Sequence, residues 1–325
     1  MISVGIIGSS GYVAGELIRL LLHHPKVNID FIYSHSMPGE KASKVHEDLI
    51  AYPDLCFTNQ VNPDVQVLFL CLGHGNSKKF LSENNFSKET KIIDLGNDFR
   101  LKEDSLYNGK QFIYGLVEAN KEDIEKAKYI ANPGCFATAI QLALLPLAKD
   151  KALDNSIHIH AITGSTGAGR SLSETSHFSW RNSNLSIYRP FTHQHLDEIE
   201  QSLTKLQSNF NQEINFIPVR GDFTRGIFAS VYTKTDLQEE ELLAMYKAYY
   251  KEHNFIITTD QTLHLKQVVN TNNCLLQIQK IGDKVLITSV IDNLIKGASG
   301  QAVQNMNLMF GLDQNTALNL KPSYF

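Results

Sequence analysis

The chain has 325 residues, of which 42% are hydrophobic and 20% charged, which is typical of a globular protein long enough for two domains. Its 30 Lys and Arg residues against 34 Asp and Glu give a formal net charge of −4, which argues against a general binder of nucleic acid or anionic membranes. No apolar stretch approaches the length of a membrane span, and the first residues enter a strand pattern without a cleavable leader. We therefore expect a cytoplasmic protein.

The first third of the chain alternates short apolar runs with helical patterns. Strands are predicted at Val4–Ile7, Val27–Tyr33, Val67–Leu72 and Lys91–Leu95, and a helix at Gly11–His23. Most of these runs are largely apolar rather than strictly alternating, which is typical of a parallel sheet covered on both faces. We predict an α/β domain with a Rossmann-like, doubly wound parallel sheet.

From about residue 157 the predicted strands become longer and partly alternating. They are Ile157–Ile162, Glu213–Pro218, Ile227–Lys234, Leu275–Ile281 and Lys284–Ile291. With one strong helix at Gln238–Lys251 among the last four, they indicate an α+β domain with a mixed or antiparallel sheet. A last helix, Ala298–Phe310, is expected to return to the first domain. The predicted domains are therefore 1–134 with 299–325 for dinucleotide binding, and 135–298 for catalysis and dimerisation.

A glycine-rich turn follows the first predicted strand, with Gly8 and Gly11 just before the first helix. Such a turn lets backbone amides approach a pyrophosphate at the N-terminus of a helix, where the helix dipole favours anions. The spacing is GxxGxxA rather than GxGxxG, and a tight turn without a ligand is the alternative. The position directly after the first strand favours a dinucleotide.

The end of the second predicted strand indicates which dinucleotide is bound. NAD enzymes usually have Asp or Glu here for the ribose 2′-hydroxyl, whereas this chain has Ser34, His35 and Ser36. Small hydroxyls and a histidine, with Lys41 and Lys44 downstream, suit a 2′-phosphate better. The prediction is NADP rather than NAD.

The four cysteines are isolated, without a CxxC pair or a Cys/His cluster at zinc spacing, which predicts neither disulfides nor a metal site. Cys135 follows Pro133-Gly134 and precedes an apolar helical pattern. The helix dipole stabilises a thiolate in such a place, so Cys135 is a candidate nucleophile, with a small buried thiol as the alternative. Cys56, Cys71 and Cys274 lie in apolar or strand-like segments and are interpreted as structural.

Two further segments carry polar groups suited to catalysis. His193 and His195 come just before a predicted helix that starts with acidic residues, and either could exchange a proton with a thiol or an oxyanion. A metal pair is a poor alternative because no third ligand is apparent. The loop Thr163–Arg170 is rich in glycine and could hold a phosphate or the nicotinamide, although most such loops are plain turns.

Seven segments together resemble the N-acetyl-γ-glutamyl-phosphate reductases of arginine biosynthesis, of the type 1 family, nearly from end to end. In chain order they are GSSGYVAGEL, DLGNDFRL, YGLVEAN, ANPGCFAT, GSTGAGR, HQHLDEIEQSL and IDNLIKGASGQAVQNMNLMFGL. The chain departs from the family pattern at Cys71–Gly75 and at Phe216–Gly226. In the second departure an extra arginine, Arg220, could bind a carboxylate on the acyl group of the substrate, or it could pair with Asp222 or face solvent.

The resemblance implies roles for particular residues. It implies Cys135 as the nucleophile, with His193 and His195 as the acid/base region, between which spacing does not decide. The cofactor residues that it implies are Gly8, Ser10, Gly11, Tyr12, Val13, Ser34, His35, Ser36, Gly167, Ala168 and Asn293. The substrate residues that it implies are Arg100, Ser165, Arg170 and Arg225.

The resemblance also implies a reaction and an assembly. NADPH would reduce an N-acyl-γ-glutamyl phosphate to the 5-semialdehyde and phosphate through a thioester on Cys135, in a homodimer or homotetramer. One alternative is an enzyme similar to aspartate-semialdehyde dehydrogenase, which shares the architecture. The other is a non-catalytic NADP-binding regulator, which would have no need of a thiolate at a helix start.

Overall fold

The computed structural model describes residues 1–324, which divide into two compact units. The first unit comprises residues 1–133 and 298–318, and the second comprises residues 134–297 and 319–324. The sequence analysis expected the whole segment from 299 onward in the first unit. The end of the chain instead joins the second unit because the Ser323 N–H donates to the Val269 carbonyl (3.1 Å) and Asn270 Nδ2 donates to Ser323 Oγ (2.7 Å).

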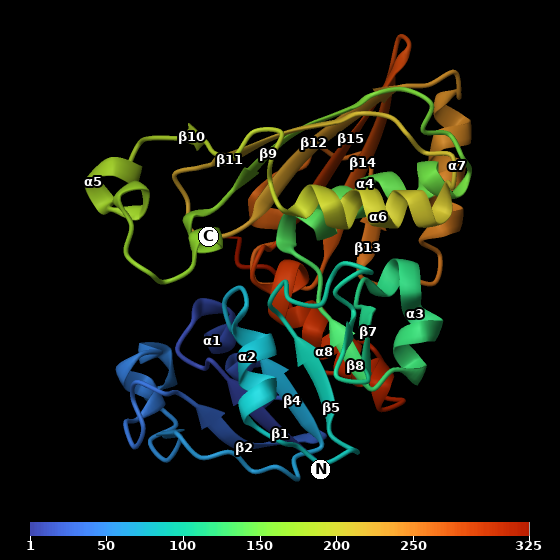
Figure 1. Ribbon diagram of the computed structural model, residues 1–325. Coiled ribbons are helices and arrows are strands. Elements are labelled where there is room, and N and C mark those ends of the chain that lie inside the picture. Colours follow the sequence, from blue (N-terminus) through green and yellow to red (C-terminus); the bar gives the residue numbers. More distant parts are fainter. Residues whose placement is uncertain (325) are drawn as a thin grey trace. The chain divides into compact units, whose positions relative to one another are not determined.

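The first unit contains an eight-stranded sheet of order β3-β2-β1-β4-β5-β8-β7-β6, in which every neighbouring pair is parallel except β6 and β7 (Figure 1). The strands are β1 Ile2–Ile7, β2 Val27–Tyr33, β3 Phe57–Thr58, β4 Val67–Leu70, β5 Lys91–Asp94, β6 Leu106–Tyr107, β7 Lys110–Tyr114 and β8 Tyr129–Ala131. Because β4 is buried along its whole length, it shows the continuous apolar pattern of a strand covered on both faces. The Rossmann-like prediction is confirmed.

The helices of the first unit are α1 Tyr12–Leu22, α2 Asn76–Glu83, α3 Val117–Lys126 and α8 Gly300–Met309, with 3₁₀ turns at Ala42–Lys44 and Glu47–Leu49. Helix α8, coloured red in Figure 1, packs against both α1 and α3, and all of its residues are buried. Its asparagines bond across these contacts: Asn307 Oδ1 lies 2.9 Å from His24 Nε2, and Asn305 Nδ2 donates to the Gly115 carbonyl (2.9 Å). The predicted helix start at Ala298 is corrected, because Ile295–Ser299 forms a π-helical turn before α8.

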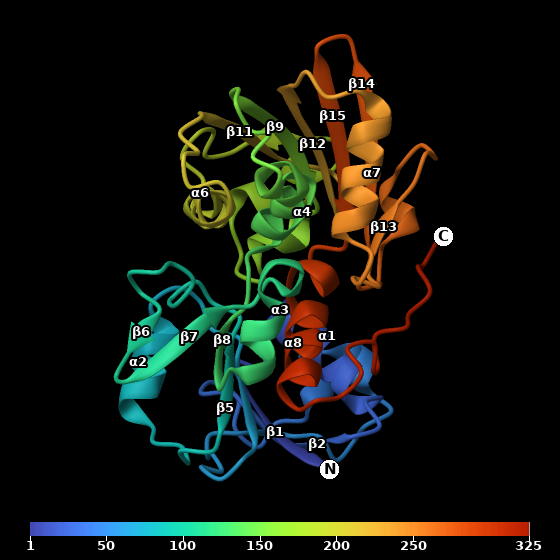
Figure 2. The same cartoon turned by 90° about the vertical axis from the view of Figure 1, so that its right-hand side faces the viewer.

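The second unit contains a seven-stranded mixed sheet of order β10-β11-β9-β12-β15-β14-β13 (Figure 2). Its strands are β9 Ile157–Thr163, β10 Ser186–Ile187, β11 Ile214–Arg220, β12 Ile227–Lys234, β13 Ile256–Thr258, β14 Cys274–Ile281 and β15 Lys284–Ile291. Two pairs, β9 with β11 and β13 with β14, are parallel, and the other neighbours are antiparallel. The predicted mixed sheet is confirmed, although β11 continues two residues beyond Pro218 to Arg220.

The helices of the second unit are α4 Cys135–Lys149, α5 Phe178–Arg181, α6 His195–Leu206 and α7 Glu239–Tyr249, with 3₁₀ turns at Ser165–Ala168, Glu174–Ser176 and Leu265–Gln267. Helix α4 is buried from residue 136 to 148, and it packs against α6, α7 and the central strands. This explains why its sequence is apolar on all sides. It continues through Pro146, which has no N–H for the Leu142 carbonyl, and the Tyr250 hydroxyl donates to that carbonyl instead (2.6 Å).

The opposite face of this sheet is less covered. Along β12 every second residue is buried, while Ser230 and Tyr232 between them are not. Across the pair, Ser230 faces His160 and Tyr232 faces His158 on β9. The alternation is that of a sheet with one face against helices and the other face accessible.

Candidate active site

Cys135 is the first residue of α4, and the extended backbone of Gly134 forms the N-cap. Its side chain is partly exposed, so a small molecule can reach the thiol. The N-cap residue, Gly134, has no side chain that could cap this helix end, and the helix is long enough for a full dipole. The position therefore combines access with the electrostatic setting that stabilises a thiolate.

Glu198 and His195, both from the first turns of α6, close around the residue before the cysteine. The Glu198 Oε2 atom accepts a hydrogen bond from the Gly134 backbone N–H (3.0 Å), and Oε1 lies 3.8 Å from His195 Nε2. A Cβ added at position 134 would lie 2.3 Å from His195 Nε2, so only glycine allows the imidazole to approach this closely. Both α6 side chains are buried, and their carboxylate–imidazole pair is therefore held next to the nucleophile.

His193 lies beside His195 but differs from it in its hydrogen bonding. Its Nδ1 atom accepts a hydrogen bond from the His195 backbone N–H (3.2 Å), so the remaining proton of the neutral ring is on Nε2. Burial lowers the pKa of His193 to about 4, and the positive charges of Arg189 and Arg220 add to this effect while Glu198 opposes it. His193 is therefore neutral at neutral pH.

Aromatic rings form the wall next to these histidines. Phe136 contacts His193 and Phe216 edge to face, with ring centroids 5.5 and 5.2 Å apart, and Tyr188 lies 6.5 Å from Phe136. Burial raises the pKa of the Tyr188 hydroxyl, so this group stays protonated. The wall makes one side of the site apolar.

The turn after β15 approaches the cysteine from another side. A Cβ added to Gly297 would lie 2.7 Å from the Cys135 Cβ, so a side chain at position 297 would collide with the nucleophile. The turn is fixed by the fully buried Asp292, whose carbonyl accepts the Gly297 N–H (3.0 Å) and whose Oδ1 accepts the N–H groups of Leu294 (2.8 Å) and Ile295 (3.0 Å). The carboxylate of Asp292 thus determines where Gly297 lies.

Hydrogen bonds connect this turn to the glycine-rich loop after β9 and to the segment around Arg225. Two residues expected to bind ligands, Arg225 and Asn293, make these bonds. Arg225, expected to bind substrate, pairs with Asp292 through Nε–Oδ2 (3.1 Å) and Nη2–Oδ1 (3.3 Å). Asn293, expected to bind the cofactor, accepts the Gly226 N–H (2.7 Å) and donates to Thr166 Oγ1 (3.0 Å). In this structure both side chains hold the loops together, and their ligand contacts stay predictions.

The remaining predicted residues of this loop are more accessible. Ser165, Gly167 and Ala168 lie in its 3₁₀ turn, and Arg170 is exposed just after it. The Ser165 N–H donates to the Phe223 carbonyl (2.8 Å), which fixes the start of the turn.

In the first unit, the predicted dinucleotide loop connects β1 to α1. Gly8 has a φ of +74°, and a Cβ there would lie 2.6 Å from the Cys71 carbonyl oxygen, so the turn requires glycine. Gly11 is the N-cap of α1 without a side-chain cap, followed by Tyr12 and Val13 in the first turn. The buried His46, which the sequence analysis missed, lies 2.7 Å from the Ser9 carbonyl oxygen through Nε2. An uncapped helix end behind a glycine turn, with Ser10 at its edge, fits a pyrophosphate.

The end of β2 carries hydroxyl groups and no carboxylate. Ser34 is buried, its N–H donates to the Thr58 carbonyl (2.9 Å), and its Oγ lies 3.5 Å from Ser36 Oγ. His35 and Ser36 are exposed. Lys44, which was expected to favour a 2′-phosphate, forms an ion pair with Glu40. These side chains fit a 2′-phosphate better than an unmodified ribose hydroxyl.

Arg100, expected to bind substrate, is buried in the first unit. Its Nε donates to the Asn132 carbonyl (2.9 Å) and its Nη2 to the Leu95 carbonyl (3.1 Å). In this structure it fixes the strand end that leads to Pro133 and the cysteine. Its contact with substrate stays a prediction.

The other cysteines have different surroundings. Cys274 is buried, with Sγ 3.5 Å from Ser289 Oγ, Cys56 is exposed, and burial raises the pKa of the Cys71 thiol. Within residues 1–324, no three His, Cys, Asp or Glu side chains are grouped so as to hold a metal ion. No helix in the same range is long and apolar enough to cross a membrane.

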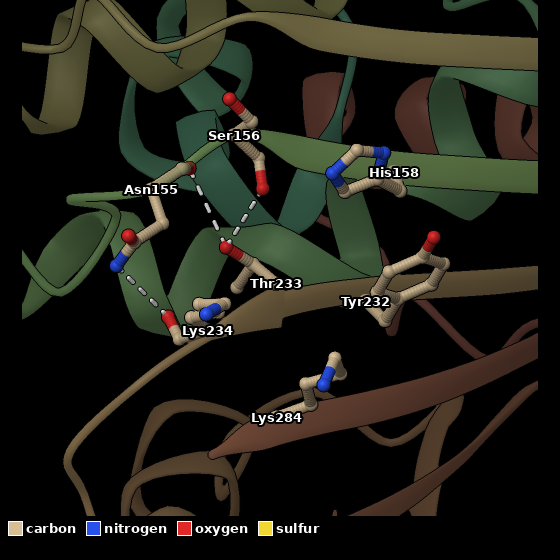
Figure 3. A pocket seen from close by; sticks show the side chains of 7 residues that line it. All are labelled: Asn155, Ser156, His158, Tyr232, Thr233, Lys234 and Lys284. Atoms are coloured by element: carbon tan, nitrogen blue, oxygen red, sulfur yellow. Dashed lines mark hydrogen bonds between the residues drawn. The ribbon is translucent and has the colours of Figure 1, made fainter.

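A separate pocket of about 260 Å³ lies at the beginning of β9 (Figure 3). Thr233 Oγ1 donates to the carbonyls of Asn155 (3.4 Å) and Ser156 (3.0 Å) at its edge, and His158 stacks on Tyr232 with ring centroids 4.8 Å apart. The glycine-rich loop follows the opposite end of the same strand. The pocket is therefore not part of the site around Cys135.

The sequence analysis named the cysteine and both histidines but missed Glu198, Tyr188 and Gly297. Glu198 had a signal, because it is three residues after His195 in a helix and so lies on the same face. The structure also corrects the helix start, because α6 begins at His195 itself. Gly297 gave no local signal, since its contact with Cys135 joins segments 162 positions apart in the numbering.

Two family models match the chain. Residues 3–127 match the semialdehyde dehydrogenase NAD-binding domain, and residues 135–293 match the semialdehyde dehydrogenase dimerisation domain. Proteins called N-acetyl-gamma-glutamyl-phosphate reductase are similar over the full length of both chains: 62% identical in Flavobacterium johnsoniae, 58% in Christiangramia forsetii and 56% in Phocaeicola vulgatus.

The chain belongs to the N-acetyl-γ-glutamyl-phosphate reductase family. The resemblance deduced from the seven motifs is thereby confirmed.

Solved structures of more distant enzymes share the fold of this reductase family member. Aspartate semialdehyde dehydrogenase II of Vibrio cholerae, complexed with ASA, aligns with a TM-score of 0.74 at 16% identity over 96% of this chain and 98% of its own. The Candida albicans aspartate semialdehyde dehydrogenase with NADP aligns with a TM-score of 0.67 at 14% identity, over 97% and 99%. At such identities the likeness supports the architecture alone.

Proposed function

We propose that the protein is an NADPH-dependent reductase that converts an N-acyl-γ-glutamyl phosphate to the N-acyl-glutamate 5-semialdehyde and phosphate, in arginine biosynthesis. The observation that carries this proposal is an accessible cysteine at the first position of α4 with a buried carboxylate–imidazole pair beside it. The full-length identity to reductases of this name supports the substrate class.

Cys135 is the proposed nucleophile. Its thiolate adds to the acyl carbon of the acyl phosphate, the bond to the phosphate oxygen breaks, and inorganic phosphate leaves while a thioester remains on Sγ. The N-terminal amides of α4 stabilise the tetrahedral oxyanion of this step. The aromatic wall around Phe136 excludes water, which protects the thioester from hydrolysis.

His195 is the proposed acid/base, rather than His193. A catalytic acid/base works best when it titrates near the operating pH. His193 has a pKa lowered to about 4 and uses Nδ1 to accept the His195 N–H, so it is a poor proton shuttle. His195 lies beside the Glu198 carboxylate, with 3.8 Å between Nε2 and Oε1, and it can protonate the departing thiolate or the oxyanion that hydride addition leaves on the substrate.

The first unit is the proposed site of NADP. The turn at Gly8 and the uncapped start of α1 would hold the pyrophosphate, and Ser34, His35 and Ser36 would receive the 2′-phosphate. When bound in reduced form, the nicotinamide supplies the hydride that converts the thioester to the aldehyde level.

The assembly that we propose is a homodimer or homotetramer. The second unit matches a dimerisation domain, and the sheet face that carries Ser230 and Tyr232 is accessible, since these two residues are not buried in the part of the chain that the structure describes. A second copy would bury this face.

The decisive experiment is phosphate-dependent reduction of NADP⁺, with N-acetylglutamate 5-semialdehyde compared with aspartate semialdehyde. We expect turnover of the acylated substrate, and Cys135→Ser should lower kcat by a factor of roughly 10³ or more while NADP⁺ still binds, because an alcohol is a far weaker nucleophile than a thiolate. Preference for aspartate semialdehyde would instead favour the structurally similar dehydrogenase activity. Binding of NADP⁺ without turnover of either substrate would favour a regulatory protein.

A further inference from the structure

The last residue of β11, Arg220, has a hydrogen-bond donor for which residues 1–324 provide no acceptor. Its guanidinium lies over the ring of Tyr188, with 4.6 Å from the guanidinium carbon to the ring centroid, and it hydrogen-bonds to that tyrosine. This donor is the Nε atom, which is buried and has no acceptor in the part of the chain that the structure describes. An unsatisfied buried donor on a charged group is costly, and a ligand oxygen would remove that cost.

Internal pairing does not account for Arg220. Asp222 is the nearest acid in sequence, but its Oδ2 accepts the Ser183 N–H (2.6 Å), and no ion pair joins it to Arg220 in the part of the chain that the structure describes. Arg225, the other arginine of this segment, is different because it is bonded to Asp292. Arg220 is thus held in place by Tyr188 without a carboxylate.

Another arginine, Arg181, lies next to Arg220. The charges of Arg220 and Asp222 act in opposite directions on the buried Arg181, and Arg220 also acts with Arg189 on His193, against Glu198. Arg181 in turn donates through Nη1 to the Arg220 carbonyl (2.7 Å), so the cationic side chains are fixed close together. Such a cluster is completed by an anion.

The position of Arg220 indicates which part of the substrate it meets. Tyr188 lies near both Arg220 and Phe136, the residue after the nucleophile: its ring centroid is 4.6 Å from the Arg220 guanidinium carbon and 6.5 Å from the Phe136 ring centroid. The phosphate leaves from the carbon that Cys135 attacks and so stays beside the thiol. An anion bound by Arg220 would lie next to Tyr188 rather than next to the thiol. It would therefore be a substrate group further along the glutamyl chain than the reacting carbon.

We propose that Arg220, oriented by Tyr188, binds a carboxylate of the substrate away from the reacting carbon. The inference rests on the proposed function, because it assumes an acyl-glutamyl substrate. Two carboxylates have the required chemistry: the α-carboxylate, present in every such substrate, and the terminal carboxylate of an acyl group such as succinyl. The planar edge formed by Nε and one Nη matches either of them with two parallel hydrogen bonds.

The test compares Arg220→Met with the unmodified enzyme in the aldehyde-oxidising direction, with N-acetyl- and N-succinylglutamate 5-semialdehyde. We expect kcat/KM for at least one semialdehyde to fall roughly tenfold or more, the loss expected for a charged hydrogen bond, while the KM values for NADP⁺ and phosphate stay within about twofold. Equal losses for both substrates assign Arg220 to the α-carboxylate. A loss confined to the succinylated substrate assigns it to the acyl group.

Arg189→Met is the matched control, because it removes an exposed neighbouring charge without removing the Nε edge. It should change kcat/KM less than about threefold.

Unchanged kinetics of Arg220→Met with both semialdehydes, or a rise confined to the KM for phosphate, overturns the inference. Melting temperature and the rate of Cys135 alkylation by iodoacetamide should match those of the unmodified enzyme, and a changed alkylation rate would place Arg220 in the thiol's surroundings instead of the substrate site. If the unmodified enzyme turns over neither semialdehyde, the proposed function fails, which is a separate result.

Discussion

The Glu198 carboxylate accepts a hydrogen bond from the Gly134 N–H at 3.0 Å, which joins the first turn of α6 to the residue directly before the nucleophile. The same carboxylate lies 3.8 Å from His195. One buried group therefore fixes the entry to α4 and provides the negative charge next to the proposed acid/base.

We expect Glu198→Gln to keep the fold and lower kcat, because glutamine can still accept the Gly134 N–H but has no charge. A fall in kcat of roughly tenfold or more is expected, because the negative charge next to the proposed acid/base is lost. The measurement is the pH dependence of kcat and kcat/KM. Glu200→Gln, an exposed acid on the same helix, is the control and should leave the profile unchanged.

The two histidines should behave differently when each is replaced by asparagine. His193→Asn should keep the shape of the pH–rate profile between pH 5 and 8, because the pKa of His193 is lowered to about 4 and the ring does not titrate in that range. His195→Asn should remove one limb and reduce kcat roughly 10²-fold or more. The opposite outcome, in which only His193→Asn removes a limb, would reverse the assignment.

His193 should also make folding depend on pH. Its pKa is lowered by burial from 6.5 to about 4, so the unfolded chain takes up a proton at a higher pH than the folded protein. The contribution of the buried, neutral His193 to the free energy of unfolding is therefore fully present above pH 6.5. It is lost as the pH falls from 6.5 toward 4. In urea unfolding at pH 7 and 5, the unmodified protein should lose more stability than His193→Asn, by on the order of 1–3 kcal/mol. An equal loss in both would show that His193 is not buried in neutral form.

The end of β2 should decide the cofactor preference. We expect kcat/KM for NADPH to exceed that for NADH at least roughly tenfold, because Ser34, His35 and Ser36 offer no carboxylate to a ribose hydroxyl. Ser36→Asp should reduce the ratio, since the new charge repels the 2′-phosphate. Ser87→Asp, in a loop before β5, is the matched control. A ratio near one in the unmodified enzyme would contradict the prediction.

Much of the fold follows from local patterns. The strands β2, β12 and β15 have the bounds that the sequence predicts. The signal is clearest in β12, where buried and accessible residues alternate, and in β15, which is buried along most of its length. Short strands such as β8, with three residues, are too brief to show periodicity and were missed. The C-terminal tail was assigned to the wrong unit because its contacts are backbone and side-chain hydrogen bonds that no apolar pattern reveals.

Some residues of the candidate site can also be predicted from local sequence, whereas others are recognised only from the structure. Cys135 was predictable because Pro-Gly marks a helix start, and the histidines because two lie close together in sequence. The choice between them needed coordinates, since it depends on which ring nitrogen accepts the His195 N–H and on the charges of Arg189 and Arg220 around His193. The engagement of Arg225 with Asp292 is likewise a contact between distant segments that composition does not show.

The place of α8 in the first unit has a consequence for how the protein forms during synthesis. This helix is made last, yet it is buried against α1 and α3, which are made first. Apart from its short C-terminal tail, the second unit is one continuous segment from 134 to 297. On the ribosome the first unit therefore stays incomplete until residue 309 has left the exit tunnel, so the continuous segment of the second unit can fold before the first unit is finished. During that interval we expect the chain to be most dependent on chaperones.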